Sequence, residues 1–352
     1  MSRWPPSSLR HLARLTDEVG IVEHARLDRP RHDLGHCTDD AGRLLALASK
    51  LPSDPDAHRL ATVALRFLAR AHEGGGHFRL RLGSDGEWTD DPPSDDAAAR
   101  GLYGLGTAAG RAPWPDVAAG ALELFDTAVG FRSVHPRAVA YAALAAVEVL
   151  QAVPEHAGAR RIVADAAELL PSAAPSPAWP WPEPRLTYAN ALLPEANLAV
   201  ATARGDRDGE DDALSLMDWL VRAETREGWF SFTPVAGRGP GEARPGFDQQ
   251  PIEAWAMADA CARAYAHAGD PRWADATRGA AGWFMGDNDV GVSVFDSDTG
   301  GGFDGLESHG VNRNQGAEST LAFVATMAQA RGLDRVGQAA RSAAAVARAS
   351  RR

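Results

Sequence analysis

Two short segments of the chain place paired aspartates where a helix is expected to begin. Thr38-Asp39-Asp40 precedes one alanine-rich apolar run, and Ser94-Asp95-Asp96 precedes another. A hydroxyl cap and acids in the first turn favour any helix start. Capping alone does not require a doubled aspartate followed by an arginine. We therefore interpret the two pairs as parts of one polar site that could do acid–base chemistry.

Four further helix starts carry carboxylates or side-chain amides. The predicted starts at 136, 194, 251 and 314 bring in Glu195, Asp248, Gln249, Gln250, Glu253, Asn314, Gln315 and Glu318, and Tyr188, Asn190 and His309 lie in the loops just before two of these starts. Amide side chains make paired contacts with neighbouring hydroxyl groups, which is a common need in sugar binding.

Four tryptophans lie in the loops that lead to these helices, namely Trp88, Trp179, Trp181 and Trp229. Their flat apolar faces could stack on the CH-rich faces of sugar rings. Carboxylates, amides and tryptophans at one end of a fold therefore predict a carbohydrate ligand.

The elements that must position these residues follow from the spacing of the six starts, at 38, 94, 136, 194, 251 and 314. This recurrence is typical of a repeated helix hairpin. The first helices are predicted at 38–50, 94–110, 136–152, 194–204, 251–268 and 314–331, and the second helices at 56–72, 114–128, 157–170, 209–222, 271–285 and 333–349. We expect an all-α fold, an (α/α)6 barrel with short β-hairpins in its loops, as a single domain over residues 1–352. All first helices would run parallel inside the ring, so their N-termini and the long loops would meet at one end.

Composition excludes several classes of function. The net charge of −11 speaks against a nucleic-acid partner. No segment resembles a membrane span or a signal peptide, and Cys37 and Cys261 form a lone distant pair, which together predict a cytoplasmic protein. Lys50 is the only lysine and has no motif around it, so Schiff-base and P-loop chemistry are not expected. We expect no cofactor, and the spacing of the histidines near the N-terminus matches no metal site.

Several blocks of the sequence resemble a bacterial (α/α)6-barrel family whose members are often labelled glycosyltransferases, because the domain is found joined to or beside such enzymes. The blocks are Gly35-His36-Cys37-Thr38-Asp39-Asp40, Trp179-Pro180-Trp181, the run from Leu186 to Glu195, the run from Asp248 to Ala254, and the run from Asn314 to Leu321. The chain is also similar to the six-hairpin glycosidases. The resemblance implies a carbohydrate-active barrel with a functional link to a glycosyltransferase. The chain itself lacks the alternation of strands and helices that a sugar-nucleotide enzyme needs.

These observations favour a glycoside hydrolase with an oligosaccharide or polysaccharide substrate. Its catalytic carboxyls would be Asp40, Asp96 and Glu318. The substrate-binding residues would be Asp39, Asp95, Trp88, Trp179, Trp181, Tyr188, Asn190, Glu195, Trp229, Asp248, Gln249, Gln250, Glu253, His309, Asn314 and Gln315. Two alternatives stay open: a non-catalytic glycan-binding partner of a glycosyltransferase, and a sugar epimerase, for which His135 and His309 would be the candidate pair at the barrel mouth.

Overall fold

The computed structural model describes residues 3–89, 94–174 and 176–349, and these are dominated by helices. Six helices form an inner set, which is α2 (Thr38–Lys50), α4 (Asp95–Arg111), α6 (Pro136–Ala152), α8 (Leu192–Arg204), α10 (Pro251–Ala268) and α12 (Ala317–Ala349). Five helices each follow an inner helix, which are α3 (Ala57–Ala71), α5 (Pro115–Ala128), α7 (Ala157–Leu169), α9 (Arg207–Glu224) and α11 (Pro271–Phe284). A short helix, α1 (Arg10–Leu15), precedes them all.

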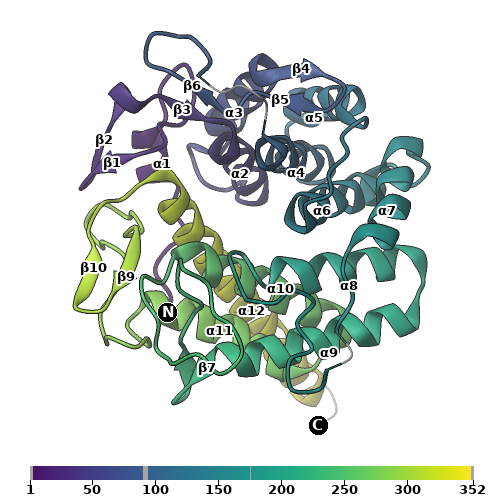
Figure 1. Ribbon diagram of the computed structural model, residues 1–352, viewed down its shortest axis with the longest axis vertical. Coiled ribbons are helices and arrows are strands. Elements are labelled where there is room, and N and C mark those ends of the chain that lie inside the picture. The colour runs from purple at the N-terminus through teal and green to yellow at the C-terminus, as the bar shows by residue number, and fades with distance from the viewer. Residues whose placement is uncertain (1–2, 90–93, 175, 350–352) are drawn as a thin grey trace.

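The inner helices form a closed ring. Each contacts the next, from α2 through α4, α6, α8 and α10 to α12, and α12 contacts α2 again. Each following helix packs on its own inner helix, so the chain winds once around the ring from purple to yellow in Figure 1. The predicted (α/α)6 barrel is therefore confirmed.

The sixth hairpin differs from the prediction. We expected a break near residue 332 and a second helix at 333–349, but α12 continues without interruption from Ala317 to Ala349. Gly332 is the only breaker there, and one glycine inside a helix is tolerated at a cost of about 1 kcal/mol. The partner of α12 is instead α1 with the N-terminal segment, because Arg331 donates to the carbonyl of Trp4 and His11 contacts the carbonyl of Gln315.

The loops at the two ends of the ring differ in length. Turns from an inner to an outer helix are short, such as 205–206 and 269–270. Loops that return to an inner helix are longer, and those before α2, α4, α10 and α12 carry the two-stranded antiparallel sheets of the described residues. The strands are β1 (Ala25–Arg26) with β2 (Arg29–Pro30), β3 (His36–Cys37) with β6 (Arg81–Leu82), β4 (His72–Gly74) with β5 (His77–Phe78), β7 (Thr225–Arg226) with β8 (Trp229–Phe230), and β9 (Gly305–Glu307) with β10 (Gly310–Asn312). No helix of the described residues is long and apolar enough to cross a membrane.

Helix starts are set by local chemistry. Ser94 caps α4 as predicted, since its hydroxyl accepts from the backbone N–H of Ala97. Thr38 does not cap α2, because it is the first residue of the helix and its hydroxyl donates to the carbonyl of Arg79.

Glycines let the first inner helices touch backbone to backbone. A Cβ added at Gly104 of α4 would lie 2.4 Å from the carbonyl oxygen of Gly42 in α2. A Cβ at Gly42 would lie 2.2 Å from the carbonyl oxygen of Arg100. This close approach fixes α2 against α4 and so fixes the two aspartate pairs relative to one another.

We predict that Gly104→Ala lowers the free energy of unfolding by about 1–3 kcal/mol, because the two helices must separate to admit the methyl group. Urea unfolding followed by circular dichroism measures this change. Gly332→Ala is the matched control, since a Cβ there meets no heavy atom within 4 Å and alanine is the better helix former. Equal stability of Gly104→Ala and the wild type would contradict the close approach of α2 and α4.

Candidate functional site

A pocket of about 330 Å³ lies where α2 and α12 begin, and we call it the mouth pocket. Four of the predicted site residues line it, namely Asp39, Asp40, Gln250 and Glu318. Four other groups that line it were not among the predicted site residues, namely Glu23, His24, Arg43 and Asp304. The pocket is rich in carboxyl groups, with one arginine among them.

Arg43 holds two carboxyls of the mouth pocket at once. Its Nη1 lies 2.8 Å from Asp40 Oδ1, and its Nη2 lies 2.7 Å from Glu318 Oε2. The side chains of Arg43 and Asp40 are each 4% exposed, whereas Glu318 is 42% exposed. Two carboxyls that share one cation therefore stand in very different surroundings.

The surroundings of Asp40 change its acidity. Burial raises the pKa of Asp40 to about 7, with smaller upward contributions from Glu318, Glu23 and Asp39, while the Arg43 charge opposes the shift. A carboxyl that is partly protonated at neutral pH can donate a proton, which is what a general acid must do.

A second arginine joins the two aspartate pairs. Arg100 Nη1 lies 2.9 Å from Asp39 Oδ2 and 3.3 Å from Asp96 Oδ2. The hydroxyl of Tyr188 donates to Asp96 at 2.9 Å. Asp39 lines the pocket, and its Oδ1 is buried without a hydrogen-bond partner among the described residues.

The contacts continue around the inner ring. Arg137, at the start of α6, donates to Asn190 Oδ1 at 3.3 Å, and Asn190 donates to Glu253, at the start of α10. Together with the Arg43 and Arg100 contacts, they join the beginnings of all six inner helices, so the N-termini do meet at one end. We call this set of side chains the polar belt.

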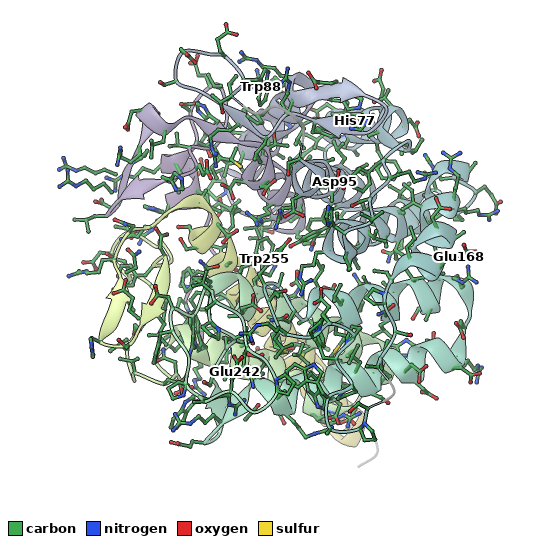
Figure 2. All side chains as sticks on the ribbon, viewed as in Figure 1. His77, Trp88, Asp95, Glu168, Glu242 and Trp255 are labelled. Atoms are coloured by element: carbon green, nitrogen blue, oxygen red, sulfur yellow. The ribbon has the colours of Figure 1, made fainter. Side chains whose placement is uncertain are left out.

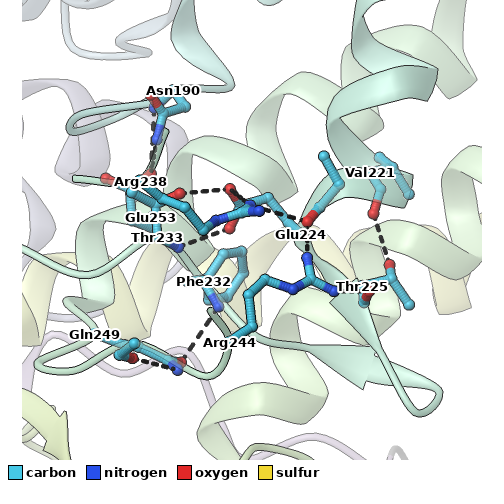
Figure 3. A network of polar contacts seen from close by, with 12 residues as sticks. Asn190, Val221, Glu224, Thr225, Phe232, Thr233, Arg238, Arg244, Gln249 and Glu253 are labelled. Carbon is cyan, nitrogen blue, oxygen red and sulfur yellow. Dashed lines mark hydrogen bonds and ion pairs between the residues drawn. The ribbon is translucent and has the colours of Figure 1, made fainter. Parts of the chain in front are cut away.

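Glu253 lies in a deeper part of the belt, shown in Figure 3. Burial raises the pKa of Glu253 to about 8, and nearby Glu224 adds to the shift, while the N–H groups of Asn190 and Ala189 oppose it. Glu224 accepts from Thr233 and pairs with Arg238 at 3.1 Å. This network holds the loop before α10 against the barrel.

Three of the predicted amides are occupied by structural contacts. Gln249 is fully buried and bonds to Trp283 and Asp289. Gln315 bonds to Thr299 and Asp296, and Asn314 accepts from the backbone of Leu27. These side chains shape the loops around the mouth pocket and do not line it.

Four other predicted residues also lie away from the pocket lining. Glu195 pairs with Arg263 of α10 at 3.1 Å and lines a different cavity. Asp95 accepts from Ser133, and Asp248 and His309 are exposed on loops.

The predicted tryptophan platforms are also corrected by the structure. Trp181 is 1% exposed and stacks on Trp219, so its ring has no free face for a sugar. Trp179 packs on the same Trp219, and Trp229 donates to Asp289. Trp88 packs on Phe67 near the edge of the molecule, far from Trp255 at the centre of Figure 2. None of the four lines the mouth pocket as described.

The arginines missed by sequence reasoning had a visible signal. Arg43 follows Asp40 by three residues and Arg100 follows Asp96 by four, which places each pair on one helix face. Glu23 had none, because it lies in the loop before α2 and away from any predicted helix start, whereas Asp304 lies in the loop before α12 that also carries His309 and Asn314. Glu23 is held by Arg81 through two contacts of 2.6 Å, and Asp304 accepts from the backbone N–H of Gly316 at 2.9 Å. Within the described residues no group of three or more His, Cys, Asp or Glu side chains could hold a metal ion.

Several solved structures share this architecture at low sequence identity. A cellobiose 2-epimerase from Bacillus thermoamylovorans aligns over 90% of this chain and 95% of its own, with a TM-score of 0.67 and 14% identity. A D-mannose isomerase aligns over 92% and 96%, with a TM-score of 0.65 and 12% identity. The cellulase Cel9M of C. cellulolyticum, solved with cellobiose, aligns over 88% and 87%, with a TM-score of 0.59 and 11% identity.

The likeness establishes the fold. No protein-family model matches the sequence, and no curated protein matches it either. The predicted similarity to six-hairpin enzymes is thus confirmed at the level of architecture, and no family can be assigned.

Trp181→Ala should act on stability and leave ligand affinity at the mouth pocket unchanged. Removing this buried ring leaves a cavity against Trp219, which costs about 3–5 kcal/mol. Thermal unfolding measures the loss of stability. Titration with oligosaccharides, at a temperature at which the variant is still folded, measures affinity. A variant with wild-type stability and weakened glycan binding would restore Trp181 as a sugar platform.

Proposed function

We propose that this protein hydrolyses glycosidic bonds, with Asp40 as general acid and Glu318 as general base. One observation carries the proposal: the two carboxyls share Arg43 at the wall of one pocket, but one is buried and the other is half-exposed. Pairs of carboxyls whose surroundings push their acidities apart are typical of glycosidase sites.

The proposed reaction uses each group once. Asp40 donates its proton to the glycosidic oxygen as the bond from that oxygen to the anomeric carbon breaks. Glu318 takes a proton from the water that attacks the anomeric carbon. The pair ends the cycle with its protonation states reversed, and exchange with solvent resets it. Arg43 holds both carboxyls in place and compensates the charge that passes from one to the other.

The walls of the mouth pocket suit sugar hydroxyls. Asp39 Oδ1 is a buried acceptor without a partner, and Gln250 and Asp304 add further acceptors. A hydroxyl-rich ligand supplies donors for acceptors of this kind. The architecture is shared with a cellulase that was solved with cellobiose, which supports a carbohydrate substrate.

An epimerase is the second candidate, because a cellobiose 2-epimerase and a mannose isomerase share the fold. Proton removal and return on two faces of a sugar carbon requires two bases. Of the described residues, the one histidine lining the mouth pocket is His24, while His135 and His309 are exposed away from it. The pocket therefore favours hydrolysis over epimerisation by paired histidines.

Asp40→Asn and Glu318→Gln should each lower kcat by about 100- to 10,000-fold, because each removes a titrating group used in the transition state. KM should change little. The measurement is release of reducing sugar from a panel of oligosaccharides and aryl glycosides. Asp95→Asn is the matched control, since Asp95 has the same chemistry at a helix start but bonds to Ser133 outside the pocket.

Three outcomes would contradict this function. Turnover of the panel by Asp40→Asn at the wild-type rate would remove Asp40 from the mechanism. Incorporation of deuterium from D2O at a sugar carbon, without bond cleavage, would favour the epimerase. Glycan binding without any turnover would favour an accessory protein.

The pH dependence of kcat/KM should show an alkaline limb near pH 7. Asp40 must be protonated to act as the acid, so activity should fall about tenfold per pH unit above its pKa of about 7. Initial rates between pH 5 and 9 test the sign. A rate that rises through pH 7 would assign Asp40 the role of base instead.

A further inference from the structure

A second cavity lies at the other end of the inner ring, and we call it the axial cavity. Its volume is about 480 Å³, and every one of the six inner helices contributes to its lining. Lys50 and Arg111 come from the last turns of α2 and α4, and Glu148, Arg263 and Gln329 come from α6, α10 and α12. None of the residues that line it is shared with the mouth pocket.

A larger cavity of about 950 Å³ adjoins the axial cavity, and we call it the side cavity. The two share Gln151, Arg263 and Ala266 as lining residues. The side cavity has an apolar wall that includes Val147, Leu150, Val163 and Leu198. Volumes of this size are typical of small-molecule sites.

Basic groups outnumber acidic ones around the two cavities. The basic lining residues are Lys50, Arg111, Arg160, Arg204, Arg263 and Arg335, against the acids Glu148, Glu195 and Asp259. This contrasts with a net charge of −11 for the chain and with the mouth pocket, where carboxyls predominate. The two ends of the barrel axis therefore have opposite local charge.

The three acids already have donors. Glu148 is held by Arg111 through contacts of 2.6 and 2.9 Å, and Glu195 by Arg263 at 3.1 Å. Asp259 accepts from Trp255 and Gln329. Burial raises the pKa of Glu195 above its usual range, while the neighbouring Arg263 opposes the shift.

Lys50, like Arg204 and Arg335, has no carboxylate of the described residues within ion-pair distance, although Asp259 and Glu148 are close enough to raise its pKa. Lys50 donates to the hydroxyl of Tyr103 at 2.9 Å. It is also the only lysine in a chain whose other basic residues are arginines. An ammonium group has three N–H donors, so two remain for a ligand.

Basic residues near helix C-termini can be explained by the helix dipole alone. That explanation covers Lys50, Arg111 and Arg204, which lie in the last turns of their helices. It does not explain Arg263, which precedes the last turn of α10, and it does not explain why the axial cavity is open. Small residues keep that volume open, since a Cβ added at Gly332 in the middle of α12 meets no heavy atom within 4 Å.

We propose that the axial and side cavities form a binding site for a small organic phosphate, with the phosphate near Lys50 and Arg263 and the organic part against the apolar wall of the side cavity. Ammonium and guanidinium groups that converge on one volume suit a phosphate. An apolar portion of the ligand would cover Val147, Leu150, Val163 and Leu198. The site lies apart from the mouth pocket and does not depend on the hydrolase proposal.

Isothermal titration of the full chain with phenyl phosphate, inorganic phosphate and phenol tests this site. Phenyl phosphate should bind at least tenfold more tightly than inorganic phosphate, and phenol should not bind. Lys50→Gln should weaken phenyl phosphate at least tenfold. Arg185→Gln, which removes the same charge from an exposed surface pair with Glu242, should leave affinity unchanged.

Gly332→Leu separates loss of binding from loss of folding. The leucine side chain enters open volume and improves helix propensity, so the melting temperature should stay level or rise while phenyl phosphate binding disappears. Asp40→Asn at the mouth pocket should bind phenyl phosphate like the wild type. The proposal is overturned if phenyl phosphate does not bind at millimolar concentration, or if Lys50→Gln and Gly332→Leu both bind it with wild-type affinity.

Discussion

The buried guanidinium of Arg43 is the contact on which the closed ring and the mouth pocket both depend. It belongs to α2, the first inner helix, and it reaches Glu318 of α12, the last. A buried cation is costly unless carboxylates compensate it, and removing either partner leaves an uncompensated charge that costs about 3–5 kcal/mol. The contact of Arg43 with Glu318 therefore both links α12 to α2 and holds Glu318 beside Asp40.

Contacts of the same kind, from an arginine on one inner helix to a polar side chain at the start of another, recur around the polar belt. Arg100 of α4 reaches back to Asp39 of α2, and Arg137 of α6 reaches Asn190, which in turn bonds to Glu253 of α10. These links run between neighbouring inner helices at their N-terminal ends, where acids also gain from the helix dipole. Charged side chains line a cavity at each end of the ring, namely the mouth pocket and the axial cavity.

The sequence predicted the architecture well because it depends on local signals. Six polar helix starts and alternating short and long connections are readable from residues such as Ser94 and Pro251. The sixth hairpin was mispredicted because Gly332 was given the weight of a helix end, and the role of α1 depends on contacts across the whole length of the chain. No local pattern shows that Trp4 meets Arg331.

The candidate site was predictable in part for the same reason. Asp39, Asp40 and Glu318 are at helix starts, and a shared end of the ring brings them together. In the sequence, Glu195 looks equivalent to the acids at the other helix starts, and Trp181 looks equivalent to the other loop tryptophans. In the structure, Glu195 pairs with Arg263 and Trp181 is buried against Trp219. Glu23 enters from a loop and has no local signal, so only the folded chain shows it.

The unequal loops at the two ends of the ring have an evolutionary consequence. Long loops meet at the mouth pocket, so insertions and deletions there can reshape what the pocket accepts without moving Gly42 away from Gly104. The far end is joined by turns as short as residues 205–206, which leave little room for such change. Divergence in this architecture should therefore accumulate at one pole of the barrel while the other pole keeps its shape, whatever molecule each descendant comes to recognise.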